Sequence, residues 1–316
     1  MLDQNLTVPR YKFQDPKTTL SGKNRARIAL SNPTTLWFNT GTICNISCAN
    51  CYIKSSPTND TLVHITAEEV LSFLCQLKNR KWPVYEIGFT GGEPFINPEI
   101  LEMIEYCLKA NYEVLILTNA MQPMMRKSVQ TKLIQLNSVY PEKLILRISL
   151  DHFSETRHNH ERGLGTFQKT LEGMDWLRDV GINMKVAGRT IWDESESDIR
   201  LGYENLFRTR NYNIDARDPK QTVLFPEIDE NFDTPEITAD CWKILGKDPN
   251  TIMCSSSRMV VKRKGSEKPV VLACTLIESS SEFELGPTLK DAEIDVALNH
   301  KNCSKFCVLG GANCSP

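Results

Sequence analysis

The 316-residue chain is predicted to form an α/β fold, namely a partial (β/α)6 barrel followed by a small cysteine-rich C-terminal extension that contains a β-hairpin. From residue 36 onward, short β-rich runs alternate with longer stretches of helical period, which is typical of a parallel sheet covered by helices. Six such units occur, too few for an eight-stranded barrel but enough for an incompletely closed one. After residue 245 the alternation ends.

Six strands and six helices account for the barrel. The expected strands are Leu36 to Asn39, Val84 to Thr90, Glu113 to Thr118, Leu144 to Ser149, Met184 to Gly188 and Thr222 to Phe225. The expected helices are Ala67 to Leu77, Glu99 to Ala110, Met121 to Leu136, Thr166 to Val180, Glu196 to Arg208 and Thr238 to Leu245. Thr66 and Glu69 form a capping box before the first helix. Functional side chains are expected at the C-terminal ends of the strands.

The two ends of the chain have different patterns. Arg258 to Lys262 and Val270 to Cys274 are predicted to be strands joined by a turn at residues 264–266. Residues 1–33 show no clear periodicity and are expected to form an extended arm. We therefore expect an N-terminal arm over 1–33, a core barrel over 34–246 and a C-terminal extension over 247–316.

The amino-acid composition of the chain excludes several classes of function. Lys and Arg total 37 and Asp and Glu total 39, giving a net charge of -2, so no global field favours nucleic acid or anionic lipid. No apolar run approaches a membrane span, and the N-terminal segment lacks the apolar stretch of a signal peptide. We expect a cytoplasmic protein with no nucleic-acid or membrane partner. Eleven cysteines are many for that compartment and favour thiolate metal ligands.

Three cysteines follow the first strand. Cys44, Cys48 and Cys51 are separated by three and two residues, so their thiolates can converge on one centre. They supply one ligand too few for a closed zinc site, but could hold three irons of a [4Fe-4S] cluster and leave the fourth iron open. A zinc knuckle or buried structural thiols are the alternatives.

The second strand leads into the sequence Thr90-Gly91-Gly92-Glu93-Pro94. Two glycines let a backbone approach a ligand closely, and the adjoining carboxylate can accept hydrogen bonds from an ammonium group. By itself such a turn after a strand is more often a plain turn than a site.

The cysteine loop and the glycine turn together resemble the radical S-adenosylmethionine (radical SAM) superfamily. Its C-x3-C-x2-C motif lies on the loop after the first strand of a six-unit partial barrel, and its GGE motif follows the second. One departure is Asn50, which stands before the third cysteine where members commonly carry an aromatic residue, whereas here Tyr52 follows it. The resemblance implies that S-adenosylmethionine chelates the open iron and that one-electron reduction yields a 5'-deoxyadenosyl radical, which abstracts a hydrogen atom from substrate.

The resemblance also implies a set of cofactor-binding residues at the strand ends. They are Gly91, Gly92, Glu93, Pro94, Asn119, Ser149, Asp151 and Arg162. In the family the GGE motif contacts the amino group of S-adenosylmethionine, and a serine and an acid after the fourth strand commonly contact the ribose or carboxylate of the nucleoside. A helix N-cap for Asp151 and a surface ion pair for Arg162 are the structural alternatives.

Five further cysteines lie in the C-terminal extension. The hairpin is expected to bring Cys254 and Cys274 together, and Cys303 and Cys307 lie on a predicted short loop, so four thiolates fit a closed [4Fe-4S] site. This arrangement resembles the SPASM or twitch extension of radical SAM enzymes and implies one auxiliary cluster. Cys314 is an alternative ligand or a hydrogen donor to a substrate radical. A zinc ribbon is the rival interpretation.

The sequence thus indicates a radical SAM enzyme of the oxidoreductase or maturase type, acting on a small-molecule or peptide substrate by oxidation, crosslinking, epimerisation or rearrangement. The expected cofactors are S-adenosylmethionine and two [4Fe-4S] clusters, one with an open iron and one auxiliary. A reducing partner such as flavodoxin or ferredoxin is also expected. The alternative is a non-catalytic iron-sulfur or zinc protein with a structural or electron-transfer role. Cys75, Cys107 and Cys241 fall in expected helices and are interpreted as core residues.

Overall fold

A computed structural model describes residues 11–226 and 233–311. Its strands are β1 (Arg27–Ile28), β2 (Thr35–Asn39), β3 (Glu86–Thr90), β4 (Glu113–Thr118), β5 (Leu144–Ser149), β6 (Asn183–Thr190), β7 (Thr222–Pro226), β8 (Ser257–Val261), β9 (Val270–Leu272), β10 (Glu284–Gly286) and β11 (Val296–Ala297). Its helices are α1 (Ala67–Arg80), α2 (Ile100–Lys109), α3 (Lys127–Val139), α4 (Glu155–Arg162), α5 (Thr166–Asp179), α6 (Glu196–Arg210) and α7 (Cys241–Leu245).

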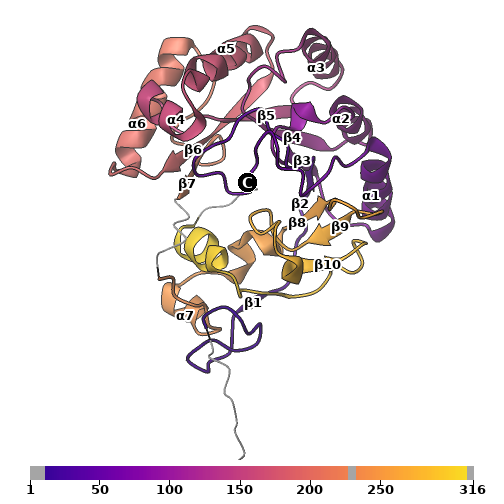
Figure 1. Cartoon of the computed structure of the whole chain (residues 1–316), viewed down its shortest axis with the longest axis vertical. Helices are drawn as coiled ribbons and strands as arrows, with labels where there is room; N and C mark the ends of the chain where they lie inside the picture. The colour runs from indigo at the N-terminus through magenta and orange to yellow at the C-terminus, as the bar shows by residue number, and fades with distance from the viewer. Residues whose placement is uncertain (1–10, 227–232, 312–316) are drawn as a thin grey trace, which may run out of the picture.

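The central element is one curved sheet. Within the described ranges it has nine strands in the order β10-β9-β8-β2-β3-β4-β5-β6-β7. Neighbouring strands from β2 to β7 are parallel, and helices α1 to α6 follow the outer side of the curve (Figure 1). The edges at β7 and β10 do not pair with each other, so the barrel is open. This confirms the predicted α/β partial barrel with six βα units.

Two apolar layers hold the sheet. Successive side chains of a strand point to opposite faces, so alternate residues belong to different layers. Leu36 and Phe38 of β2 belong to the cluster that contains the inner faces of the helices. Trp37, between them, belongs to a second cluster with Leu115 of β4 and with the C-terminal extension. The interior of the barrel is therefore packed against the extension.

The extension joins the sheet of the barrel. β8 and β9 form the expected antiparallel hairpin, with Met259 opposite Leu272. β8 also pairs in parallel with β2, which brings Trp37 level with Met259. In Figure 1 the orange and yellow C-terminal segment lies across the open side of the barrel. The extension therefore closes off the side that the helices leave uncovered.

Local differences from the sequence prediction have physical causes. Helix α3 begins at Lys127 and not at Met121, because residues 121–126 form turns in which the backbone N–H of Met121 donates to the side chain of Asn119 at 3.0 Å. Helix α4 was not predicted, because its sequence ETRHNHER has no apolar stripe. Cys75 is exposed on α1, so its prediction as a core residue is wrong, whereas Cys107 is buried as predicted.

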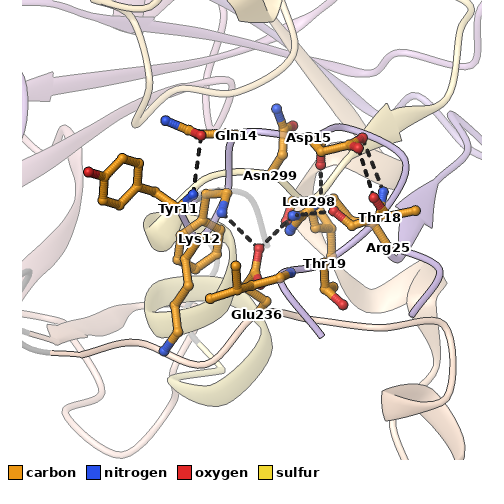
Figure 2. Close-up of polar contacts among 12 residues, drawn as sticks. Tyr11, Lys12, Gln14, Asp15, Thr18, Thr19, Arg25, Glu236, Leu298 and Asn299 are labelled. Carbon is orange, nitrogen blue, oxygen red and sulfur yellow. Dashed lines mark hydrogen bonds and ion pairs between the residues drawn. The ribbon is translucent and has the colours of Figure 1, made fainter. Parts of the chain in front are cut away.

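The N-terminal arm is bound to the rest of the molecule. β1 pairs antiparallel with β11 of the extension. A buried ion pair between Arg25 and Glu236 at 2.5 Å anchors it further (Figure 2). Glu236 accepts backbone hydrogen bonds from Phe13 at 2.7 Å and Leu20 at 2.6 Å, and Arg25 donates to the carbonyl of Leu298 at 3.2 Å. In the described part of the chain no helix is both long and apolar enough to span a bilayer.

Candidate active site

A cavity of about 170 Å³ opens at the C-terminal ends of the parallel strands. Its wall combines the loop after β2 with residues at the ends of β3 to β7, one residue of α4 and two of the extension. The cysteine, glycine and polar residues on it are Cys44, Cys48, Asn50, Cys51, Tyr52, Ser55, Thr90, Gly91, Gly92, Thr118, Asn119, Ser149, Asp151, Arg162, Gly188, Arg189 and Thr275. All three cysteines of the loop and six of the eight predicted cofactor-binding residues therefore face one space.

The three cysteines are suited to bind a metal cluster only as thiolates. Burial raises the pKa of Cys44 to about 12. Burial also raises the pKa of Cys48, although the guanidinium of Arg162 acts in the opposite direction. The thiols of Cys44 and Cys48 are thus protonated without metal, and binding of a cluster releases their protons. Among the described side chains, no three His, Cys, Asp or Glu residues are close enough together to bind a single metal ion. A four-iron cluster does not require this, because each thiolate binds a different iron and the thiolates lie further apart.

The glycine turn after β3 holds the cysteine loop in place. The backbone N–H of Gly92 donates to the carbonyl of Gly41 at 2.8 Å, and that of Glu93 donates to the carbonyl of Ile43 at 3.1 Å. A Cβ atom on Gly92 would lie 2.1 Å from the carbonyl oxygen of Ile43, and Gly91 has a φ of 136°. No side chain fits between this turn and the loop, so both positions require glycine.

Glu93 lies behind the cavity wall. It is 2% exposed, and its carboxylate accepts hydrogen bonds from the hydroxyl of Thr118 at 2.8 Å and from the backbone N–H groups of Asn119 at 2.9 Å and Phe95 at 3.2 Å. Burial raises its pKa to about 7, against these hydrogen bonds. Pro94 is also buried, at the start of a 3-10 turn. Glu93 and Pro94 are the two predicted cofactor-binding residues that do not line the cavity.

Asp151 and Arg162 form a bidentate pair on the wall. The guanidinium of Arg162 contacts the two carboxylate oxygens of Asp151 at 2.8 and 3.0 Å. Neither of the structural alternatives applies, since Ser154 occupies the N-cap of α4 and the side chains of Arg162 and Asp151 are only 15% and 6% exposed. The pair places a fixed carboxylate at the end of β5, next to Ser149.

Asn119 connects the end of β4 to the cysteine loop. Its side-chain amide donates to the Oδ1 of Asn45 at 2.8 Å, and its Nδ2 lies 4.0 Å from the sulfur of Cys44. Its backbone carbonyl accepts a hydrogen bond from Thr170 of α5 at 3.1 Å. Asn119 therefore holds the loop at Asn45, whereas the glycine turn holds it at Gly41 and Ile43.

Sequence reasoning did not identify a third anchor of the cysteine loop. The amide of Asn50 donates to Glu161 at 2.8 Å, and Glu161 pairs with Arg189 at 3.3 Å. Arg189 donates to the backbone carbonyl of Asn50 at 2.6 Å and lies 4.5 Å from the ring centroid of Tyr52. Arg189 follows directly on the predicted strand that ended at Gly188, and that position was the available signal. Asn50 thus replaces the usual aromatic residue with a polar contact.

The four predicted auxiliary ligands surround one small cavity in the extension. Cys254, Cys274, Cys303 and Cys307 line a space of about 20 Å³ whose remaining wall is mostly apolar. Cys303 and Cys307 lie on a helical turn and not on the predicted loop. Burial raises the pKa of Cys254 to about 11 and that of Cys303 to about 12. Cys314 lies outside the described residues.

A buried arginine stands beside this cysteine cavity. Arg258 of β8 is 1% exposed, and its hydrogen bonds within the described chain all go to backbone carbonyls, including that of Cys254 at 2.6 Å. Burial lowers its pKa to about 10, while Cys254 and Cys274 act to raise it. A buried cation is ordinarily paired with an anion. Thiolates bound to a metal cluster would supply that anion.

Comparison with known proteins identifies the family. The family model of the Radical SAM superfamily matches residues 38–200, slightly more than half of the chain. The chain belongs to the radical SAM superfamily. It is therefore a member of a family of enzymes that use a [4Fe-4S] cluster and S-adenosylmethionine, and the matched range contains the cysteine loop, the glycine turn and the Asp151–Arg162 pair.

Individual radical SAM relatives are similar over part of their length. The chain is 34% identical over 145 residues to the antilisterial bacteriocin subtilosin biosynthesis protein AlbA of Bacillus subtilis, covering 46% of this chain and 30% of AlbA. It is 28% identical over 154 residues to the putative peptide biosynthesis protein YydG of the same organism, covering 48% of this chain and 46% of YydG. The chain thus matches less than half the length of either relative.

Solved structures share the fold. SuiB of Streptococcus suis bound to S-adenosylmethionine superposes with a TM-score of 0.59 at 12% identity, over 81% of this chain and 63% of SuiB. Native anSMEcpe with bound AdoMet has a TM-score of 0.59 at 16% identity, over 82% of this chain and 80% of that chain. These coverages are larger than the matched family range, so the fold similarity extends beyond residues 38–200.

Proposed function

We propose that this enzyme reductively cleaves S-adenosylmethionine and abstracts a hydrogen atom from a peptide substrate. The observation that carries the proposal is the shared cavity, onto which three cysteines and six predicted cofactor-binding residues converge from five elements. AlbA and YydG are described as bacteriocin and peptide biosynthesis proteins, and SuiB has been solved with a precursor peptide. Their descriptions favour a peptide over a small molecule.

The residues of the cavity have different proposed roles. Cys44, Cys48 and Cys51 hold the cluster, and Asp151, fixed by Arg162, offers its remaining lone pairs to ribose hydroxyls. When bound, the cluster and S-adenosylmethionine supply a 5'-deoxyadenosyl radical for hydrogen abstraction. Apolar side chains exclude water and unwanted hydrogen donors from the same space. They are Trp37, Leu117, Phe225 and Leu276.

The proposed division of the chain is an arm over 1–33, a core over 34–246 and an extension over 247–316. The extension is proposed to hold one auxiliary [4Fe-4S] cluster. Cys254, Cys274, Cys303 and Cys307 are the proposed ligands, and the charge of Arg258 offsets the negative charge that they carry as thiolates. Cys314 remains the alternative ligand or a hydrogen donor.

A one-electron donor must act with the enzyme. A ferredoxin or flavodoxin in the cytoplasm fits this role, because a reducing compartment keeps eleven cysteines available as thiols. The reaction that follows hydrogen abstraction is one of oxidation, crosslinking, epimerisation or rearrangement.

Anaerobic reconstitution tests the proposal. Wild-type protein is expected to bind roughly eight irons per chain in two four-iron clusters, and to release 5'-deoxyadenosine when dithionite and S-adenosylmethionine are added. Cys44→Ala should abolish that release, whereas Cys75→Ala on the exposed face of α1 serves as the matched control and should retain it. Equal release by Cys44→Ala and wild type would contradict the proposal.

A further inference from the structure

A second cavity of about 330 Å³ lies between the cysteine loop and the C-terminal extension. It shares Asn50, Cys51, Tyr52, Arg189 and Leu276 with the first cavity, so the two spaces meet along these residues. The exposed side chain of Lys54 lines it as well, so this cavity reaches the surface of the molecule. A molecule bound here would extend from solvent to the wall of the active site.

Two buried acceptors on this cavity have no hydrogen-bond donor. Glu278 is 6% exposed and Asn302 is 8% exposed, and both line the space. Among the described residues, neither the Oε2 of Glu278 nor the Oδ1 of Asn302 receives a hydrogen bond. The amide nitrogen of Asn302 is used, since it donates to the carbonyl of Leu276 at 3.1 Å, and this contact fixes which end of the amide is the unsatisfied one.

The free-energy cost of leaving these two acceptors unsatisfied points to a missing hydrogen-bond donor. An unsatisfied buried polar group destabilises a protein by about 1–3 kcal/mol, and most such groups in folded proteins are paired. Burial also raises the pKa of Glu278 to about 7, although Arg263 and Lys54 oppose that change. A ligand that brings N–H groups would satisfy both acceptors at once.

The other residues of the cavity select the kind of donor. Lys54 and Lys301 also line the wall and can donate hydrogen bonds to carbonyl or carboxylate oxygens, whereas Arg189 is paired with Glu161. A peptide backbone presents neutral N–H donors and carbonyl acceptors together. A free amine would satisfy Glu278, but it brings no acceptor for the two lysines.

We propose that the second cavity is a peptide-binding subsite in which the side chains of Glu278 and Asn302 turn toward the substrate and accept hydrogen bonds from its backbone N–H groups. This inference rests on the proposed function for its substrate class, and it adds the place where the peptide enters and the residues that hold it. The peptide then lies along the residues shared with the first cavity, next to the cysteine loop.

Ligand-observed saturation-transfer NMR on the oxidised, cluster-loaded enzyme tests the subsite without turnover. The probes are N-acetyl-Ala-Ala-Ala amide, which has no free amine, and the same acetylated peptide with every amide nitrogen methylated, which removes its N–H donors. Wild type should saturate the unmodified peptide several-fold more strongly than the methylated one. Glu278→Met should remove that preference, and Glu278→Gln, which keeps an acceptor oxygen, should restore it.

Glu267→Met is the matched control, because Glu267 is exposed at the tip of the hairpin and touches neither cavity. It should behave as wild type. Equal saturation of the two peptides by wild type, absence of saturation by both, or an unchanged preference in Glu278→Met would overturn the subsite. Release of 5'-deoxyadenosine is measured separately. Its absence would refute the proposed function and leave the binding result standing.

Discussion

The two glycines after β3 have a steric role that is separate from any contact with a cofactor. Gly92 donates its N–H to Gly41, and the carbonyl of Ile43 occupies the place where a Cβ would lie. The cysteine loop therefore depends on a position that carries no metal-binding group. A sequence motif interpreted only as a ligand site would miss this dependence.

Gly92→Ala is expected to lose about four irons per chain, because the loop must move away from the turn and its three cysteines are displaced from the positions at which they hold the cluster. Iron and sulfide analysis after reconstitution measures this. Gly265→Ala is the control, since a Cβ there meets nothing within 4 Å and the change adds only the strain of a φ of 81°. Full iron content in Gly92→Ala would show that the loop does not rely on this contact.

His158 is a buried residue whose protonation should control stability in acid. Both of its ring nitrogens lack a hydrogen-bond partner in the described chain, and its ring packs against Phe167 at 5.5 Å. Burial and then the charge of Arg162 lower its pKa to about 3. The unfolded chain takes up a proton near pH 6.5 while the folded protein does not, so stability falls as the pH drops below that value.

We expect the free energy of unfolding of the metal-free protein to fall between pH 6 and pH 4 by about 1.4 kcal/mol per pH unit more in wild type than in His158→Leu. Urea titrations at several pH values give this slope. His160→Gln should keep the wild-type slope, because the side chain of His160 is 76% exposed. Identical slopes for His158→Leu and wild type would contradict the assignment.

At the level of elements, helix α1 begins as its sequence predicts. The hydroxyl of Thr66 accepts from the N–H of Glu69 at 3.2 Å, and the carboxylate of Glu69 accepts from the N–H of Thr66 at 2.9 Å. Thr66→Ala should lower the free energy of unfolding by about 1 kcal/mol in denaturant titrations. Ser154→Ala at the start of α4 is the matched control and should change it little, because Ser154 makes no capping hydrogen bond. Equal losses would refute the capping argument.

The predictable elements were those with a local pattern. Strands β4 and β5 have the predicted limits, because their β-rich runs end at turn residues. Helix α4 was missed because a polar helix has no apolar period, although it supplies Arg162 and Glu161 to the site. The pairing of β8 with β2 was also not predicted, because a contact between segments far apart in the chain produces no local pattern in the sequence of either strand.

The candidate site likewise contains residues that a local sequence pattern reveals and residues whose role depends on contacts between distant segments. The spacing of the cysteines, together with the resemblance to the radical SAM superfamily, led to the predicted site residues, and six predicted cofactor-binding residues share one cavity wall. Arg189 and Asn50 were not assigned a role, because their contact with Glu161 appears only when α4 and β6 are placed beside the loop. Motifs thus identify groups that bind, and packing identifies groups that position them.

At the scale of the whole molecule, the N-terminal arm links the C-terminal extension to the segment that contains Glu236. Glu236 holds Arg25 and two backbone N–H groups of the arm, while Arg25 reaches Leu298 of the extension (Figure 2). Glu236→Gln leaves a buried guanidinium without its anion and should destabilise the protein by about 3 kcal/mol in denaturant titrations. Asp233→Asn, which breaks an exposed ion pair between the same segments, should cost less than about 1 kcal/mol. Comparable losses in both variants would contradict this role.

The central claim is that Cys44, Cys48 and Cys51 leave one iron of a four-iron cluster available to S-adenosylmethionine. Electron paramagnetic resonance of the dithionite-reduced protein tests it most directly, with spectra recorded before and after S-adenosylmethionine is added. The account predicts that the added cosubstrate changes the spectrum of wild type and leaves that of Cys44→Ala unchanged. A wild-type spectrum that is the same with and without S-adenosylmethionine would contradict it.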